Sequence, residues 1–318
     1  MNTSRIRNVI DTHYHIMPPR YVARARDRIA DVSAGLKGPF EWTPSRGIGV
    51  MDEEGVETAV TSISAPGVWF GDASVAGDLA RICNEFAGQL AGDYAGRFAT
   101  FATLPLPDID RTLKEIEYAV DVLKTHGFCV MTSYDDKWLG DASFAPVFEE
   151  LNRHHAVVFV HPTAPERCTN FVPGIPSATM EFLFDTTRTI SSLLLSGSTL
   201  RFPNIRFIFS HCGGTFPMLM PRVARLNDRS SGVPGIVERE VKKLFYDVAS
   251  VAAPATVGAL RHMAPVSQIV FGSDAPYFRP DKTIADLAAL GFTDGEAKAI
   301  HRENGLALLA RINGSDKD

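Results

Sequence analysis

The sequence contains few cysteines, and their positions exclude a disulfide framework. Among its 318 residues there are four cysteines, at positions 83, 129, 168 and 212, and they form no CxxC pair. Disulfide-stapled secreted folds and zinc-finger modules both need closer, more regular spacing. Isolated thiols are typical of a reducing compartment, so we expect a cytoplasmic protein.

Long apolar runs and an excess of positive charge are also absent. No stretch approaches the roughly 18 apolar residues of a transmembrane helix, and the N-terminal MNTSRIRNVIDTHYH has no apolar core of a signal peptide. With 32 Lys and Arg against 37 Asp and Glu, the net charge is −5. A mildly acidic chain has no electrostatic footprint for nucleic acid or an anionic membrane. We expect neither as a partner.

Short apolar runs rich in β-branched residues recur along the chain, as they do in parallel strands buried on both faces. Segments with helical spacing separate most of them, and the last such segment, within 293–318, is expected to be a C-terminal helix and tail. The runs lie at 8–11, 57–63, 97–103, 127–132, 156–160, 205–210, 244–249 and 268–272.

Eight strands alternating with helices predict one α/β domain over residues 1–318, a (β/α)8 TIM barrel. An open doubly wound sheet is the alternative, but the GxGxxG turn that would favour it after the first strand is absent. Two long segments without a clear pattern are expected to be irregular: 17–49, an extension after the first strand, and 162–178 after the fifth. Long loops in compact domains are usually functional.

Histidines follow two of the predicted strands. His13 and His15 lie in IDTHYH, and side chains two residues apart on an extended chain point to the same side, where both can reach one metal ion. His161 ends AVVFVHP, where a buried strand emerges. Taken singly, each is better explained as a surface or core pair, or as a hydrogen-bonded core histidine.

Two further polar residues end later strands. His211 ends IRFIFSHCGG, and Asp274 lies in IVFGSDAP. An incidental turn residue or a helix N-cap would explain either alone. Together with His13, His15 and His161, however, they occupy the carboxyl ends of strands, the face where barrel enzymes carry their chemistry. Three imidazoles and a carboxylate drawn from these five residues suit zinc or another divalent ion. The remaining histidines (126, 154, 155, 262 and 301) are expected to be surface or capping residues.

The chain resembles the amidohydrolase superfamily, and within it the metal-dependent decarboxylases of the aminocarboxymuconate-semialdehyde, γ-resorcylate and 6-methylsalicylate type. Within that group, MEFLFDTTRTISSLLLSGS (180–198) is most similar to the methylsalicylate enzymes. The segments that carry the resemblance are DTHYHIMPP (11–19), MDEEGVETAV (51–60), VFVHP (158–162), SGSTLRFPNIRFIFSHCGGTFP (196–217) and FGSDAPY (271–277).

The resemblance implies a barrel with one divalent metal ion per chain, Zn²⁺ or alternatively Mn²⁺, held by the set His13, His15, His161 and Asp274. His211 would be a catalytic residue beside it. Binuclear relatives carry a lysine at the end of the fourth strand, but here that strand ends CVMTSYDD and Lys137 comes several residues later. A mononuclear site is therefore favoured. The family also implies a homodimer, in which Arg222 would reach across the interface; a solvated helix arginine is the alternative.

The function favoured by this resemblance is non-oxidative decarboxylation of a small hydroxylated aromatic acid, which yields CO₂ and a phenol. The ring carbon must accept a proton as CO₂ leaves, so a positioned acid is required. Asp274 is the residue expected to supply that proton, and His211 is expected to polarise the phenolic oxygen or relay the proton.

Aromatic side chains in the loops after the strands are candidates for walling a flat ring, since ligand pockets are mostly apolar. Ordinary packing would explain each of them equally well. These candidates are Trp69, Phe70, Phe171, Tyr277 and Phe278.

Two other functions use the same residues. A metal-dependent hydrolase of a lactone or an amide could generate its nucleophile at this site. A closed structural metal site is the third alternative, but it would not need His211 beside it or the long loops.

Overall fold

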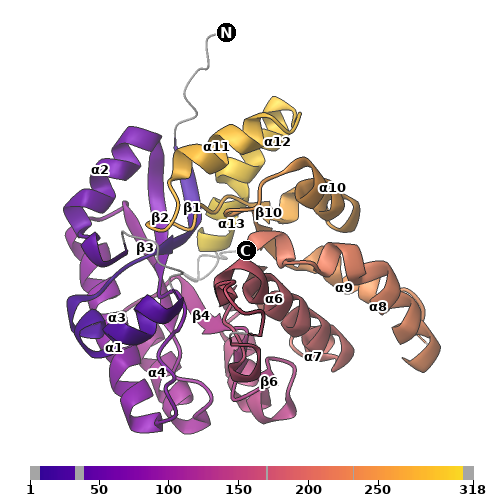
Figure 1. Ribbon diagram of the computed structural model, residues 1–318, viewed down its shortest axis with the longest axis horizontal. Helices are drawn as coiled ribbons and strands as arrows, with labels where there is room; N and C mark the ends of the chain where they lie inside the picture. Colours follow the sequence, from indigo (N-terminus) through magenta and orange to yellow (C-terminus); the bar gives the residue numbers. More distant parts are fainter. Residues whose placement is uncertain (1–7, 33–38, 170, 232, 311–318) are drawn as a thin grey trace, which may run out of the picture.

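The computed structural model describes residues 8–32, 39–169, 171–231 and 233–310. An eight-stranded sheet of parallel strands forms its centre, in the order β1-β2-β3-β4-β7-β8-β9-β10, and a separate two-stranded hairpin pairs β5 with β6 (Figure 1). The strands are β1 (Val9–His15), β2 (Val56–Ser62), β3 (Phe98–Thr103), β4 (Gly127–Met131), β5 (Ser133–Tyr134), β6 (Lys137–Trp138), β7 (Val157–His161), β8 (Arg206–Phe209), β9 (Phe245–Asp247) and β10 (Ile269–Val270).

Backbone hydrogen bonds join the two ends of this sheet. Thr12 N donates to Phe271 O at 2.9 Å and His15 N donates to Ala275 O at 2.6 Å, so β1 meets the segment that leaves β10. The predicted (β/α)8 barrel is therefore confirmed, and each of the eight apolar runs overlaps one of its strands. The first strand extends beyond its predicted run, because β1 continues through His15.

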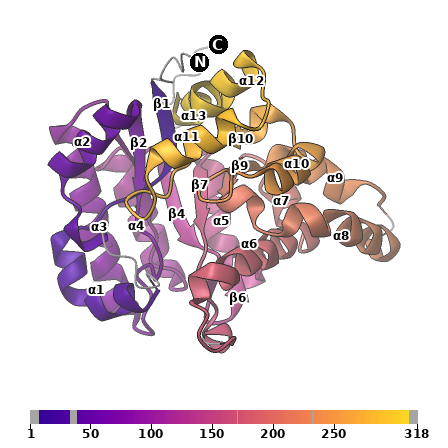
Figure 2. The same cartoon turned by 45° about the horizontal axis from the view of Figure 1, so that its top comes forward.

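Helices surround the strands on the outside of the barrel (Figure 2). Among the described residues, none of them combines the length and apolar character that a membrane-spanning segment needs. They are α1 (Pro19–Val32), α2 (Pro44–Glu54), α3 (Ala73–Asp93), α4 (Ile109–Asp121), α5 (Ala145–Arg153), α6 (Ser177–Leu195), α7 (Ser198–Arg201), α8 (Phe216–Ser231), α9 (Ile236–Glu240), α10 (Pro254–Met263), α11 (Pro280–Ala288), α12 (Asp294–Lys298) and α13 (Asn304–Ala310).

The expectation that 17–49 is irregular was wrong. The segment contains α1 and the start of α2, and Tyr21, Ala25 and Ile29 on one face of α1 are buried. Alternating charged and small residues obscured this narrow apolar stripe, whose spacing of four residues is helical. Residues 33–38 of the segment lie outside the described residues, as do 311–318 of the predicted tail.

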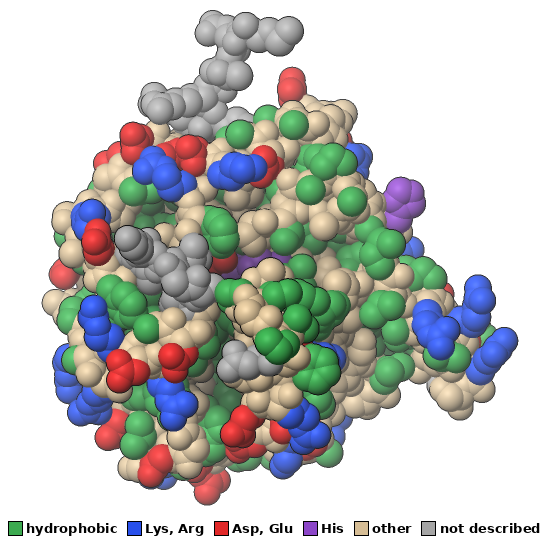
Figure 3. All heavy atoms as spheres, viewed as in Figure 1, with side chains coloured by type: hydrophobic (Ala, Val, Ile, Leu, Met, Phe, Trp, Pro, Cys, Tyr) green, Lys and Arg blue, Asp and Glu red, His purple; other side chains and the backbone are tan. Residues whose placement is uncertain are grey.

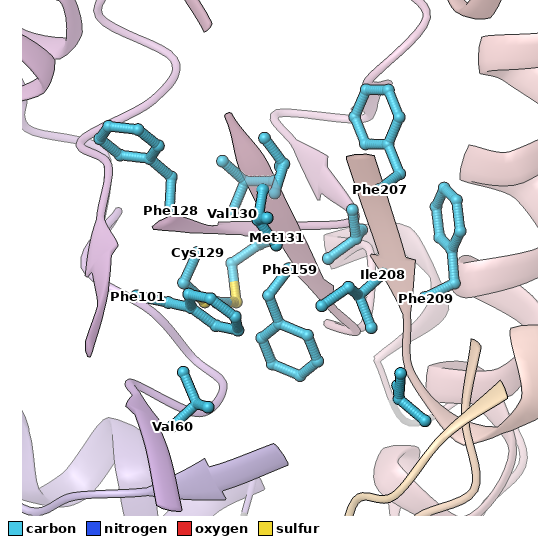
Figure 4. Packing of buried hydrophobic residues seen from close by; sticks show 14 of the residues in the cluster. Val60, Phe101, Phe128, Cys129, Val130, Met131, Phe159, Phe207, Ile208 and Phe209 are labelled. Atoms are coloured by element: carbon cyan, nitrogen blue, oxygen red, sulfur yellow. The ribbon is translucent and has the colours of Figure 1, made fainter. Parts of the chain in front are cut away.

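The barrel interior is filled by side chains that alternate along each strand. Phe159 of β7 points inward and stacks on Phe101 of β3, with ring centroids 5.9 Å apart. On β8, Ile208 points inward, whereas Phe207 and Phe209 point outward to the helices (Figure 4). Because both faces of each strand are covered, the runs are apolar throughout.

One of the histidines expected at the surface is buried. His301 is 4% exposed and stacks on Phe271, with ring centroids 5.5 Å apart. It lies in a π-helical turn (Ala299–Glu303) that packs against the barrel strands. The sequence pattern gave no signal for this turn, since its spacing differs from that of an α-helix.

A glycine brings α6 close to the barrel mouth. Gly214, just after β8, has φ +64° and ψ −129°, a conformation that other residues adopt only under strain. A Cβ atom at this position would lie 2.2 Å from the backbone oxygen of Leu183 in α6. Only glycine therefore allows helix and turn to approach so closely.

We predict that Gly214→Ala lowers the free energy of unfolding by about 1–3 kcal/mol through backbone strain alone, with the clash adding to it. Gly258→Ala is the matched control. Gly258 lies in α10 with nothing within 4 Å of the added carbon, so alanine there should raise stability by about 0.5–1 kcal/mol. Urea unfolding measures both, and equal stability of the two variants would contradict the prediction.

Candidate metal centre

Three histidines and one aspartate converge at the carboxyl ends of the barrel strands. His13 and His15 end β1, His161 ends β7, and Asp274 follows β10. One ligand atom from each lies within 4.8 Å of the others, and the group could hold one metal ion. We call these four residues the His3Asp cluster. In Figure 3, histidine surface is visible near the centre of the face shown, between the surrounding loops.

Each histidine of the cluster is anchored through its Nδ1 atom. His13 Nδ1 lies 2.8 Å from Asp247 Oδ2, and His161 Nδ1 lies 2.8 Å from its neighbour's carbonyl, Pro162 O. His15 Nδ1 lies 3.2 Å from Ser62 Oγ. An Nδ1–H that donates to an oxygen leaves the Nε2 lone pair free, as in histidines that bind metals.

The atoms that face one another inside the cluster are therefore acceptors. His13 Nε2 lies 3.0 Å from His15 Nε2, and Asp274 Oδ1 lies 3.4 Å and 3.2 Å from these two atoms. A carboxylate accepts only, and so does a neutral Nε2. Such a set is stable when a cation lies between its members. The residues present therefore have the chemistry to hold a metal ion.

The electrostatics of the cluster favour one positive charge at its centre, either a proton on His13 or a metal ion. Burial disfavours charge on His13, but the carboxylates of Asp247 and Asp274 outweigh it and raise the pKa of His13 to about 10. Burial and the neighbouring His15 and His13 hold the pKa of His161 well below its usual value. Burial opposes ionisation of Asp274, yet the nearby histidines hold its pKa well below the usual range. The site thus accommodates positive charge at its centre.

His211 lies beside the cluster. Its Nε2 is 3.5 Å from Asp274 Oδ2, so the two oxygens of Asp274 face different partners. Its Nδ1 is buried and makes no hydrogen bond with any described residue. His211 and Asp274 both have positive φ, 55° and 67°, a strained conformation that is common at functional sites.

A cavity of about 260 Å³ opens above these residues. His161, His211 and Asp274 lie in its lining, and so do Tyr277 and Phe278, two of the predicted wall residues. The lining residues that the structure describes include no Lys or Arg. The rest of this described lining is Val32, Ser64, Ala65, Ala178, Thr179, Phe182, Leu183 and Ser250.

The other predicted substrate contacts lie elsewhere. The Trp69 indole donates to Asp135 Oδ1 at 2.7 Å, and Phe70 lies under Arg28, 5.9 Å from ring centroid to guanidinium carbon. Phe171 is 73% exposed. Arg222 is exposed on α8. None of these four residues lines the cavity.

Sequence reasoning missed two buried carboxylates behind the cluster. Asp247 ends β9 and also accepts from the backbone N–H of His211 at 2.9 Å, so it holds two site residues at once. Asp11 accepts from Ser273 N at 3.0 Å and from Ser273 Oγ at 2.5 Å, which ties β1 to the segment carrying Asp274. An acid at the end of an apolar run (FYD and VID) was the available signal.

Comparison with known proteins identifies the family. A family model described as amidohydrolase matches residues 10–311. The chain belongs to the amidohydrolase family. This confirms the resemblance that the strand-end motifs predicted. The amidohydrolase is 34% identical to decarboxylase yanB of Aspergillus niger, over 95% of this chain and 88% of the relative. It is 33% identical to 6-methylsalicylic acid decarboxylase of Penicillium expansum, over 96% and 97% of the two chains.

Solved structures share the fold of this amidohydrolase. An amidohydrolase II crystal structure superposes with a TM-score of 0.89 at 26% identity, covering 95% of this chain and 100% of the other. A dihydroxybenzoic acid decarboxylase from Polaromonas, solved with manganese and 2-nitroresorcinol bound, superposes with a TM-score of 0.81 at 20% identity, covering 96% and 97%.

We predict that Asp247→Asn weakens metal binding about 10–100-fold, the usual effect of losing a partner behind a metal-bound histidine. The amide cannot replace the charge that Asp247 places beside His13. Competition titration with a chromogenic chelator measures the affinity. An unchanged dissociation constant would show that His13 needs no such anchor.

Proposed function

We propose that this amidohydrolase is a metal-dependent carboxy-lyase that decarboxylates a small hydroxylated aromatic acid without oxidation, releasing CO₂ and a phenol. The observation that carries the proposal is that the two oxygens of Asp274 have different neighbours. Oδ1 faces His13 and His15, and Oδ2 faces His211 beneath the cavity. The relatives named as decarboxylases support the same reaction.

The metal proposed here is one divalent ion per chain, held by the His3Asp cluster. When bound, it would supply a Lewis acid and a template for neighbouring carboxylate and phenolic oxygens of the substrate. Imidazole and carboxylate ligands suit Zn²⁺, whereas the Polaromonas structure contains manganese. Separate reconstitution of the metal-free protein with each ion distinguishes the two.

The cavity walls suit a flat ring with one carboxylate. Phe182, Tyr277 and Phe278 offer aromatic contacts, and Ser64 and Thr179 offer hydroxyl groups to ring substituents. We assign the countercharge for the substrate carboxylate to the metal ion proposed at the floor of the cavity. That arrangement directs the carboxylate, the group to be lost, toward the His3Asp cluster.

The reaction needs one proton at the ring carbon that loses CO₂. We assign its delivery to Asp274, with His211 as the partner that takes up a proton from solvent and returns it to Asp274 Oδ2, so that one proton is consumed per turnover. This return is necessary because Asp274 has given up its proton at the end of each turnover. The carbon–carbon bond breaks, its electron pair restores the aromatic ring, and the proton stays on carbon.

The first experiment is product analysis. Protein loaded with Zn²⁺ or Mn²⁺ is incubated with salicylate, 6-methylsalicylate, 2,6-dihydroxybenzoate and 5-carboxyvanillate, and phenols are separated by chromatography. We predict that His211→Asn retains one metal ion per chain and loses about 10²–10⁴-fold in turnover. His161→Ala, in contrast, should lose the metal as well.

Full activity of His211→Asn would remove that residue from the mechanism. Wild-type protein that binds one metal ion per chain but forms no phenol would instead favour hydrolysis of a lactone or an amide.

We also propose a homodimer that forms through α8. In Figures 1 and 2, α8 and α9 extend away from the barrel, and Met218 and Leu226 on α8 are 74% and 49% exposed. Exposed apolar side chains on a projecting helix are typical of an interface. Arg222 lies on the same helix, from which it would approach the partner's site.

We predict sedimentation at about twice the chain mass of 34.7 kDa. The double variant Met218→Asp, Leu226→Asp should sediment as a monomer. Val75→Asp is the matched control, because Val75 is 42% exposed on α3, outside the proposed interface. A wild-type monomer would contradict the proposal.

A further inference from the structure

One helix carries the wall of the cavity that faces the His3Asp cluster. Thr179, Phe182 and Leu183 of α6 line the cavity, and the Phe182 ring stands edge-on to His161 with centroids 6.1 Å apart. The separation between α6 and the ends of the strands therefore determines the width of the space that the cavity leaves for a substrate ring.

A buried carboxylate one turn further along α6 fixes this separation. Asp185 is 0% exposed. Its Oδ2 accepts from Thr132 Oγ at 2.5 Å and Ser133 Oγ at 2.8 Å, and its Oδ1 accepts from the Trp138 indole at 2.6 Å. Arg188 Nη1 lies 3.6 Å away. Burial raises the pKa of Asp185, and the hydrogen bonds oppose that rise. Because every one of these neighbours donates, the carboxylate is matched to them in its ionised form.

Thr132, which bonds Asp185, also bonds the backbone at His161 and at Thr163. Thr132 N donates to His161 O at 3.0 Å. Thr132 Oγ accepts from Thr163 N at 3.0 Å while it donates to Asp185. His161 Nδ1 in turn lies 2.8 Å from Pro162 O. A continuous chain of hydrogen bonds thus runs from α6 through Thr132 to the backbone that orients the His161 ring.

A second attachment keeps α6 in place on its other side. Thr187 Oγ accepts from Thr215 N at 2.9 Å, in the turn that follows His211. Loss of the Asp185 contacts would therefore shift the helix relative to His161 without releasing it from the barrel. A variant at Asp185 can in this way change the site while the fold is retained.

We propose that Asp185 is a positioning residue that holds the α6 wall and His161 in one fixed arrangement. Its hydrogen bonds fix the width of the cavity around the aromatic ring and the placement of His161 in the His3Asp cluster. Its effect on substrate rests on the function proposed above, whereas its effect on metal binding can be measured without any turnover.

The test variant is Asp185→Asn. The Trp138 N–H can only donate, so the amide oxygen must face it and the amide NH₂ must face the hydroxyls of Thr132 and Ser133. Glu115→Gln is the matched control. Glu115 is a carboxylate 4% exposed between α3 and α4, bonded by Arg81 Nη2 at 2.9 Å and Asn84 Nδ2 at 2.8 Å. It has the same kind of burial and pairing but lies in the outer helical layer.

The probe is Co²⁺, followed by its visible absorption band and by competition titration. Asp185→Asn should bind one Co²⁺ per chain with an affinity about tenfold lower and with a shifted band, since His161 is displaced. With the aromatic acid that the wild type decarboxylates, KM should rise about tenfold while kcat changes less. Glu115→Gln should lose stability but keep the wild-type band, Co²⁺ affinity and KM.

A second pair of variants keeps the test decisive if Asp185→Asn does not fold. Thr132→Val removes the linking hydroxyl at nearly constant volume and should reproduce the band shift, whereas Thr132→Ser keeps the hydroxyl and should restore the wild-type band. Matching behaviour of these two variants, or of Asp185→Asn and Glu115→Gln, would overturn the proposal. If wild-type protein decarboxylates none of the acids, the function proposed above fails. The Co²⁺ comparison still tests whether Asp185 positions His161 for metal binding.

Discussion

Mutual repulsion among acceptor atoms is the constraint on which this site depends. The Nε2 atoms of His13 and His15 and Oδ1 of Asp274 approach one another closely in a buried setting, where unpaired lone pairs are costly. The protein sustains this arrangement by anchoring each imidazole from behind, through Asp247, Ser62 and Pro162. The outer partners thus determine which atoms face inward, and these inward atoms form a group that could hold one metal ion.

The barrel could be predicted from sequence because its strands are buried on both faces. Runs such as AVVFV contain no polar position, and this property depends only on local composition. The cluster residues could be found for a related reason. They end such runs, so the parallel arrangement of the strands brings His13, His161 and Asp274 to one edge irrespective of loop structure.

The parts that sequence did not reveal depend on packing between distant segments. The stripe of α1 is narrow, and the α6 wall is recognisable only when the helix is seen folded over the barrel mouth. Asp247 and Asp11 appear in sequence as ordinary strand-end acids, and their partners lie 234 and 262 residues away. Aromatic residues in the loops were poor guides to the cavity, because an indole such as that of Trp69 is equally useful for bonding a neighbouring loop.

The cavity is assembled from two parts that the hydrogen bonds of Asp185 and Thr132 hold together. Its floor is made by strand ends, which hydrogen bonds hold on every side, whereas its facing wall is part of a single helix that meets the floor through a few side chains. An exchange at a wall position such as Thr179 would leave the floor residues and the hydrogen bonds of Asp185 in place. A duplicated gene could therefore diverge toward a differently substituted ring through wall mutations alone, and directed evolution of this scaffold would have the same route open to it.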